Sequence, residues 1–206
     1  KLYISPAVAV AETTKAVTAM GVIAKDNFAK GCMQLFAYDE ALAKEIDENE
    51  TALDAFADQS DRFMIGLSKA IETETDDRQL DMLMQTVPNF ERIGDYATNM
   101  VELAQRLEGE KTSFSDTAKD ELKIITSAVN EILEITVKAF GEDDNQAARS
   151  IEPLEETIDD MVMILRDRHT KRLKSGACSV SSGLVFMEAL TYLERASDQC
   201  SSIAVM

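Results

Sequence analysis

The sequence has no tryptophan, a single histidine, and few of the residues that interrupt regular structure. Its 206 residues include only 8 Gly and 3 Pro, too few for the frequent tight turns of an all-β protein. The 3 cysteines are an odd number and lack the close pairing of zinc ligands, which argues against a disulfide framework and a zinc ribbon. We expect them to be reduced thiols in the core.

The chain is also poor in positive charge and in long apolar runs. Lys and Arg number 21 against 38 Asp and Glu, and the formal net charge is −17. This excess repels nucleic acid and anionic membrane surfaces, and it makes cations the natural small partners. The longest uncharged stretches, such as residues 2–11 and 178–187, are about half the length that spans a bilayer, which predicts no membrane insertion. Because the chain starts at Lys1 rather than Met, we expect it to be a piece of a longer protein.

Apolar residues recur at helical spacing along almost the whole sequence. They predict six helices, over about residues 6–37, 39–71, 76–107, 115–141, 145–173 and 180–206. The inward stripe of the second helix is predicted to contain Leu53, Phe56, Phe63, Leu67 and Ala70. Short turns make neighbouring helices antiparallel, and a break near residues 109–115 divides the chain. We therefore predict an all-α fold of two tandem three-helix bundles, residues 1–110 and 111–206.

The two predicted halves contain related sequences. Glu91, Asp95 and Asn99 lie four residues apart in the segment ERIGDYATN, so a helix puts their side chains in one row. The Glu-Arg pair and the aspartate return 103 residues later in the segment ERASD, residues 194–198. The surrounding apolar positions shift by the same interval. The chain is therefore interpreted as an internal duplication.

Each half contains a second Glu-x-x-x-Asp pair in matching register. The four matched pairs are Glu50/Asp54 and Glu91/Asp95 in the first half, and Glu155/Asp159 and Glu194/Asp198 in the second. Two further pairs, Glu72/Asp76 and Glu156/Asp160, have no repeat partner. We expect the matched acids at the flank between core and water, where hard oxygen ligands suit Mg²⁺, Ca²⁺, Mn²⁺ or ferric iron better than zinc. The alternative is a solvated acidic face in a protein that is acidic throughout.

These motifs resemble the PhoU family, all-helical cytoplasmic regulators of phosphate uptake built from two three-helix bundles. The segment His169-x-x-Arg172-Leu173-x-x-Gly176-x-Cys178 adds to this resemblance. The opening Ser5-Pro6-Ala7-Val8-Ala9 is most similar to the PhoU-like domain at the carboxyl end of bacterial sodium/phosphate cotransporter family proteins. The resemblance implies one multinuclear metal cluster for each half. The implied ligands are Glu50, Asp54, Glu91 and Asp95 in one, and Glu155, Asp159, Glu194 and Asp198 in the other.

The metals implied by the resemblance are multivalent ions, iron clusters among them, with Mg, Mn, Ca, Zn and Ni also plausible. The sequence departs from the family where histidine often follows the motif aspartate, because Tyr96 and Gln199 stand there. The first half also has Asn99 one turn beyond its last acid, whereas Ser202 is the counterpart in the second half. A polar group so placed can orient ligands, so we expect the first site to bind metal more tightly.

Three basic residues near the motifs allow more than one interpretation. His169 could be a metal ligand, although its place near a helix end favours either capping of carbonyl groups or a position near the helix dipole. Arg92 and Arg195 each follow a motif glutamate and could contact phosphate. Pairing with neighbouring carboxylates is the simpler expectation for both arginines.

The sequence contains no catalytic constellation, because it lacks a Gly-rich phosphate loop and a nucleophile with a paired base. The resemblance implies a non-enzymatic regulatory domain of a sodium/phosphate cotransporter family protein, on the cytoplasmic side of the membrane. Its expected partner is the transporter portion of the same or another chain, with a homodimer as a further option. One alternative is a free-standing PhoU-type negative regulator of phosphate uptake. Another is a di-metal carboxylate enzyme, which normally needs Glu-x-x-His pairs that one histidine cannot supply.

Overall fold

The computed structural model describes residues 5–205, and this part of the chain forms helices, turns and short links without a β-strand. The helices are α1 (Pro6–Gln34), α2 (Glu40–Ser68), α3 (Glu74–Gly109), α4 (Asp116–Glu142), α5 (Asn145–Ala148), α6 (Ile151–Ser175) and α7 (Val180–Ala204). All the long helices except α6 begin and end within a few residues of the predicted bounds. The all-α prediction is confirmed.

Polar side chains fix where most of these helices begin. The capping residues of α1, α2, α3, α4 and α7 each accept a hydrogen bond from the backbone N–H three residues later; they are Ser5, Asp39, Thr73, Ser115 and Ser179. Each cap satisfies a donor that has no partner inside its own helix. The short links between helices follow directly from these start signals, and they keep successive helices antiparallel.

The predicted fifth helix, residues 145–173, is wrong at its start. The chain forms the single turn α5, and α6 begins only at Ile151. Pro153 gives the physical reason, because inside a continuous helix its ring would clash with the carbonyl group of Arg149. At the third position of α6, by contrast, the missing N–H of Pro153 is one that the helix could not use.

The inward stripe predicted for α2 is partly wrong. Leu53 and Leu67 are buried and Phe56 is half-buried, but Phe63 is 54% exposed and Ala70 lies exposed beyond the helix. The buried row steps alternately by three and four residues through Ala43, Ile46, Glu50, Leu53, Ala57, Ser60, Met64 and Leu67. Glu50 thus stands within the buried row and not at its flank, which differs from the expectation for the motif acids.

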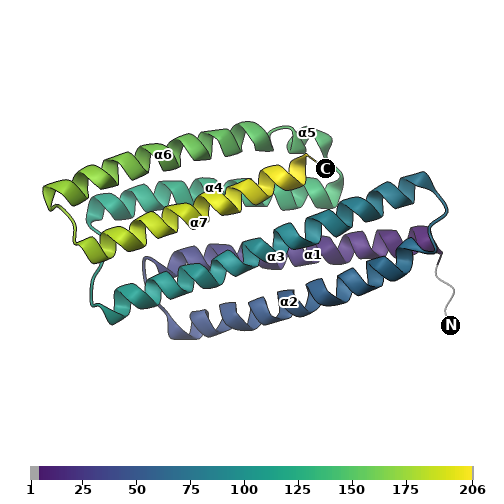
Figure 1. Ribbon diagram of the computed structural model, residues 1–206, viewed down its shortest axis with the longest axis horizontal. Helices are drawn as coiled ribbons and strands as arrows, with labels where there is room; N and C mark the ends of the chain where they lie inside the picture. The colour runs from purple at the N-terminus through teal and green to yellow at the C-terminus, as the bar shows by residue number, and fades with distance from the viewer. Residues whose placement is uncertain (1–4, 206) are drawn as a thin grey trace.

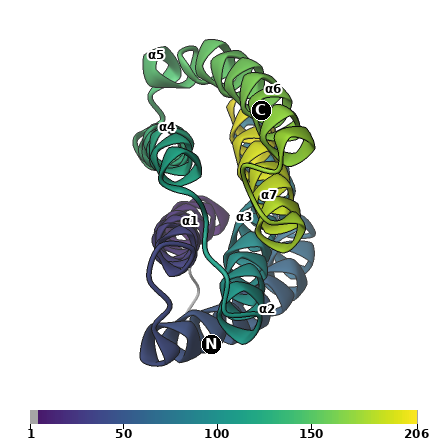
Figure 2. The ribbon, with the colours of Figure 1, turned by 90° about the vertical axis from the view of Figure 1, so that its left-hand side faces the viewer.

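The helices form two bundles joined along their length. α1, α2 and α3 pack together, as do α4, α6 and α7, and the bundles meet where α3 packs on α7 and α1 packs on α4 (Figure 1). Figure 2 shows α1 and α4 on one side of the molecule, with α2, α3, α7 and α6 following one another along the other side. The predicted pair of three-helix bundles is confirmed. The link between α3 and α4 contains the predicted division at residues 110 and 111, which stays a prediction.

Two glycines allow α1 to approach α3 closely. A Cβ atom at Gly21 would lie 2.6 Å from the Phe90 ring, and one at Gly31 would lie 2.8 Å from the carbonyl oxygen of Ala97. Packing therefore requires glycine at both positions, although glycine is unfavourable inside a helix. Phe90 fills the space above Gly21 and is fully buried. The cost of interior glycine is offset by this contact between the two helices.

One described helix, α1, is long and apolar enough to cross a membrane on length and composition alone. Its most apolar 18-residue window has a mean hydropathy of 1.3, and a third of that window is buried in the protein. A single such helix is a weak indication, because core helices of soluble proteins meet the same two criteria. In this structure α1 packs against α2, α3 and α4.

The three cysteines are free thiols, as the sequence predicts. Cys32 and Cys200 are buried, whereas Cys178 is only half-buried in the link between α6 and α7. Burial raises the pKa of the Cys200 thiol to about 12, so this group stays protonated at neutral pH. The two buried cysteines behave as small apolar core residues.

Candidate metal centres

Three carboxylates from two helices form the first acidic cluster. Glu50 and Asp54 are supplied by α2 and Asp95 by α3, and each offers an oxygen atom within 4.8 Å of the others. The four-residue spacing of Glu50 and Asp54 puts both on one side of α2. Cations of the Mg²⁺ and Ca²⁺ type bind oxygen at roughly 2.0–2.6 Å, so one ion can reach all three carboxylates. The matched register predicted this association.

Glu50 is the most constrained member of the first acidic cluster. Its side chain is 8% exposed, and neither carboxylate oxygen has a hydrogen-bond partner within residues 5–205. Gly94 leaves the space it occupies, because a Cβ atom there would lie 2.7 Å from Glu50 Oε2. An unpaired charge so buried is costly, and it requires either a proton or a cation.

The pKa of Glu50 reflects this crowding. Burial first, and then the nearby carboxylates of Asp95, Asp54 and Glu91, together raise the pKa to about 9. Two carboxylates cannot hydrogen-bond to each other, but a single proton shared by Glu50 and Asp95 would join them. A multivalent cation would displace that proton and neutralise the same group. The donor set therefore fits a hard metal ion.

The second acidic cluster repeats this arrangement with Glu155 and Asp159 from α6 and Asp198 from α7. One oxygen atom of each again lies within 4.8 Å of the others. Asp159 Oδ1 is buried without a hydrogen-bond partner in the described chain. Burial and the neighbouring acids raise the pKa of Glu155 to about 7 and also raise the pKa of Asp159. Its residues are less buried than Glu50, so neutralisation by a cation is less strongly required.

The fourth acid predicted for each site lies outside these close groups, and its surroundings differ between the halves. Burial and the carboxylates of Asp54 and Asp95 raise the pKa of Glu91, which therefore borders the first acidic cluster. Glu194 is instead paired, because its Oε2 accepts a hydrogen bond of 3.0 Å from Arg166 Nη2. A fixed guanidinium group thus neutralises one acid of the second half.

Arg166 is a residue that our sequence analysis missed. It also donates a hydrogen bond of 2.9 Å to Thr191 Oγ1, which fixes its side chain between α6 and α7. The interval of 105 residues that relates Glu155 to Glu50 relates Arg166 to Asp61. A comparison of the repeats at this position would have revealed the reversal of charge. The first half therefore presents more uncompensated negative charge than the second.

His169 belongs to neither acidic cluster, and its ring faces α7. Its ring stacks on Phe186 with centroids 4.2 Å apart, and its Nδ1 lies 2.9 Å from Nη2 of Arg172. Arg172 in turn makes two hydrogen bonds to the buried carboxylate of Glu121. Burial and the Arg172 charge lower the pKa of His169, so the ring is neutral. Its role is to pack α6 against α7.

The expected pairing of Arg92 and Arg195 with carboxylates is wrong. Both side chains are exposed, and neither takes part in an ion pair with any residue from 5 to 205. Asn99, expected to orient ligands in the first half, is half-buried one turn beyond Asp95 on α3. Its influence on the first acidic cluster stays a prediction.

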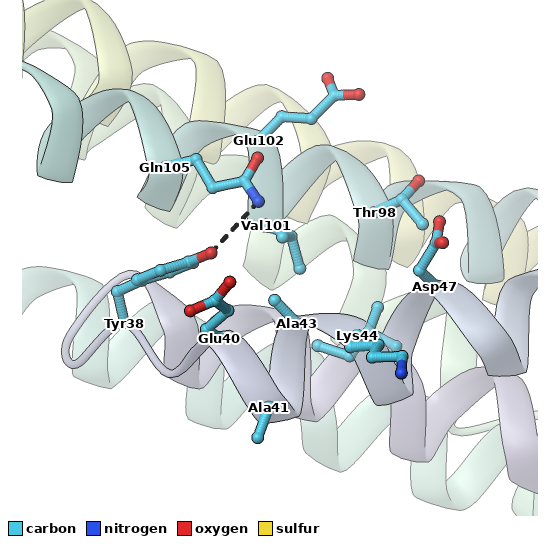
Figure 3. A pocket seen from close by; sticks show the side chains of 11 residues that line it. Tyr38, Glu40, Ala41, Ala43, Lys44, Asp47, Thr98, Val101, Glu102 and Gln105 are labelled. Atoms are coloured by element: carbon cyan, nitrogen blue, oxygen red, sulfur yellow. Dashed lines mark hydrogen bonds between the residues drawn. The ribbon is translucent and has the colours of Figure 1, made fainter.

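A groove with a volume of about 730 Å³ lies between the start of α2 and the later turns of α3. Figure 3 shows Tyr38 near one end, where its hydroxyl accepts a hydrogen bond of 3.3 Å from Gln105 Nε2. The lining consists of Tyr38, Glu40, Ala41, Ala43, Lys44, Ile46, Asp47, Thr98, Val101, Glu102 and Gln105. The groove ends one turn before Glu50, so it borders the first acidic cluster but contains none of its ligands.

Comparison with known proteins identifies relatives along most of the chain. A Thermotoga maritima protein named phosphate-specific transport system accessory protein PhoU homolog 1 is 26% identical over 184 residues, which cover 82% of this chain and 78% of the relative. A protein of the same name from Methanothermobacter thermautotrophicus is 25% identical, with 82% and 77% covered. The crystal structure of PhoU from Pseudomonas aeruginosa superposes with a TM-score of 0.87 at 23% identity, covering 96% of this chain and 94% of that one.

The PhoU domain profile matches residues 17–104 and 122–205. Each matched segment falls in one of the two helical bundles, so the profile and the internal duplication agree. Each segment also contains two of the matched Glu-x-x-x-Asp pairs. The chain therefore belongs to the PhoU family.

Proposed function

We propose that this chain is a PhoU-type regulator of phosphate transport that acts on a separate transporter and binds multivalent cations at its two acidic clusters. The regulatory role is supported by the similarity to accessory proteins of phosphate-specific transport systems. The cation role is supported by a single structural observation, the buried carboxylate of Glu50, which has no partner among the described residues.

A separate transporter is favoured over the cotransporter domain expected from the opening segment. This chain covers 78% and 77% of the two accessory proteins, so most of their length is the helical unit itself. Proteins of that size have little room for a transporter of several membrane spans. The similarity thus supports the free-standing regulator, which the sequence left as an alternative, working beside a membrane transporter in the cytoplasm.

The chemistry of the clusters fits binding and regulation better than catalysis. Oxygen ligands from two adjacent helices can hold a cation and fix the spacing of those helices. An ion at either cluster would be bound by carboxylates. The sole histidine belongs to neither cluster, and it contacts Phe186 and Arg172 instead. Ion occupancy would set the shape of the α2–α3 and α6–α7 surfaces that a transporter component could contact.

The regulatory role is tested by uptake of radiolabelled phosphate in cells that lack the gene. We expect faster uptake in phosphate-rich medium, restored to normal by the wild-type gene.

The metal role is tested separately by metal analysis of the purified chain after incubation with Mn²⁺ or iron. Glu50→Gln should lower the metal content, whereas Glu72→Gln, in a pair without a repeat partner, should not. Unchanged uptake would contradict regulation, and equal metal content in both variants would contradict the assigned ligands.

A further inference from the structure

Arg92 and Arg195 are equivalent residues of the two repeats, and both are free of ion pairs in the described chain. Each directly follows a motif glutamate, on α3 and on α7 respectively. Both side chains are exposed in a protein whose net charge is −17. Arg166 is bound to Glu194 and Arg172 to Glu121, whereas Arg62 and Arg149 are also exposed without an ion pair in the described chain. Arg92 and Arg195 differ from these two because they occupy the same place in the two repeats, each beside a matched motif acid.

The contacts between α3 and α7 put these two arginines at one level. The rings of Tyr96 and Tyr192 lie 6.1 Å apart, and Arg106 makes two hydrogen bonds of 2.8 Å to Glu188. These contacts align α3 and α7 as antiparallel neighbours, as Figure 1 also shows. In this alignment residues 92–95 of α3 pass residues 195–198 of α7. Arg92 and Arg195 therefore flank the seam between the bundles, between the two acidic clusters.

Helical spacing puts both arginines beside the contact between the two tyrosine rings. Arg92 lies four residues before Tyr96 on α3, and Arg195 lies three residues after Tyr192 on α7, so each arginine shares one side of its helix with a tyrosine. Because the two helices are antiparallel and the rings lie 6.1 Å apart, both arginines lie on the same side of that contact along the seam. The seam brings together two guanidinium groups and a phenol, all of which can donate hydrogen bonds.

We propose that Arg92 and Arg195 bind one tetrahedral oxyanion, inorganic phosphate, at the seam between α3 and α7. Guanidinium groups present parallel N–H donors that match the oxygen atoms of phosphate, and two of them on facing helices can hold one anion from both sides. The choice of phosphate among oxyanions rests on the function proposed above. The anion would connect the two bundles at the point where they meet.

The neighbouring acids make this site dependent on the metal centres. Without cations, Asp95 and Asp198 repel an anion at the seam. Cations bound at the two acidic clusters would neutralise these carboxylates and leave the charges of Arg92 and Arg195 uncompensated. Phosphate should therefore bind more tightly to metal-loaded protein, and by thermodynamic linkage phosphate should tighten the binding of metal.

Calorimetric titration of inorganic phosphate into the purified chain tests this proposal. The chain is first loaded with Mn²⁺ and freed of unbound metal, and a second sample is treated with EDTA. We expect weaker binding in the second sample and a loss of affinity of about tenfold or more in Arg92→Gln/Arg195→Gln. Arg149→Gln, which removes an exposed arginine at the end of α5, is the matched control and should bind as wild type does. Thermal melting checks that every variant is folded.

The possible results separate this proposal from the metal function. If the double variant keeps its metal and binds phosphate as tightly as wild type, the anion contacts the metal and the arginine site is wrong. If neither wild type nor variant binds phosphate while both hold metal, the proposed ligand is wrong and the metal centres stand. Sulfate and glycerol phosphate are titrated in parallel. Tighter binding of glycerol phosphate than of inorganic phosphate would contradict the choice of the free anion.

Discussion

Glu50 of α2 lies directly against Gly94 of α3, where any side chain would collide with its carboxylate group. The two residues come from different helices, so their contact sets how closely α2 and α3 approach beside the first acidic cluster. Glycine at this position makes room for a charged group within the buried row of α2. The helix contact and the candidate metal site therefore depend on the same pair of residues.

Gly94→Ala should weaken the first metal centre. The new methyl group would lie 2.7 Å from Glu50 Oε2 and 2.8 Å from Leu53 Cδ1, so both side chains must move. We expect lower metal content and a lower melting temperature. Gly66→Ala on α2 is the control, because nothing lies within 4 Å of its added methyl group. The control should gain about 1 kcal/mol of stability from helix propensity, roughly 2–4 °C in melting temperature. A Gly94→Ala variant that matches this gain would disprove the steric argument.

The metal-free protein should lose stability as the pH rises from about 4.5 to about 9. Over this range the folded state keeps a proton on Glu50 that the unfolded state has lost, so the unfolding free energy falls with pH. Glu50→Gln removes this titration and should flatten the dependence, measured by urea unfolding in EDTA at several pH values. The variant should also melt at a higher temperature than wild type at pH 8 without metal. Glu72→Gln should retain the wild-type slope, and an unchanged slope in Glu50→Gln would contradict the assignment.

The two centres should differ in affinity, with the first binding metal more tightly. Asp95→Ala should remove the more tightly held metal, and Asp198→Ala the weaker one. Asn99 and the uncompensated charge of Asp61 both favour the first half, and polar groups around ligands can contribute about 10–100-fold in affinity. Metal content after stepwise chelation measures the order of release. Loss of the tighter metal in Asp198→Ala would reverse the assigned roles.

Arg166→Asp should make the second half more like the first. Removal of the guanidinium group frees Glu194 and adds the acid that Asp61 supplies in the other repeat. We expect tighter cation binding at the second acidic cluster and a larger gain in melting temperature on addition of metal. Lys171→Asp makes the same change of charge at a surface ion pair of α6 and is the control. If both variants change metal affinity equally, general charge and not the contact with Glu194 is responsible.

The fold was largely predictable because the spacing of apolar residues in a long helix records its buried side. The errors arose where one residue changed the local geometry. Pro153 separates α5 from α6, and in α2 the buried row passes through Met64 while the neighbouring Phe63 is exposed. A sequence that offers apolar residues at adjacent positions does not say which one the neighbouring helix will cover. Only the packing of α2 on α3 decides this.

The candidate site was predictable along each helix but not across helices. The four-residue spacing put Glu50 with Asp54 and Glu91 with Asp95, and the repeats identified the matched pairs. The rotation of α2 about its axis brings Glu50 into the close group with Asp95, and Glu91 is not a member of that group. That rotation follows from contacts such as the one with Gly94, which have no signature in a single sequence.

The position of α3 has a consequence for how the protein unfolds. This helix packs on α1 and α2 within its own bundle and on α7 of the other, and α1 also packs on α4. Separation of the repeats would expose apolar surface on several helices at once, so neither repeat should melt independently of the other. The duplicated chain should therefore unfold in one cooperative transition. Each three-helix repeat depends on the other for its stability.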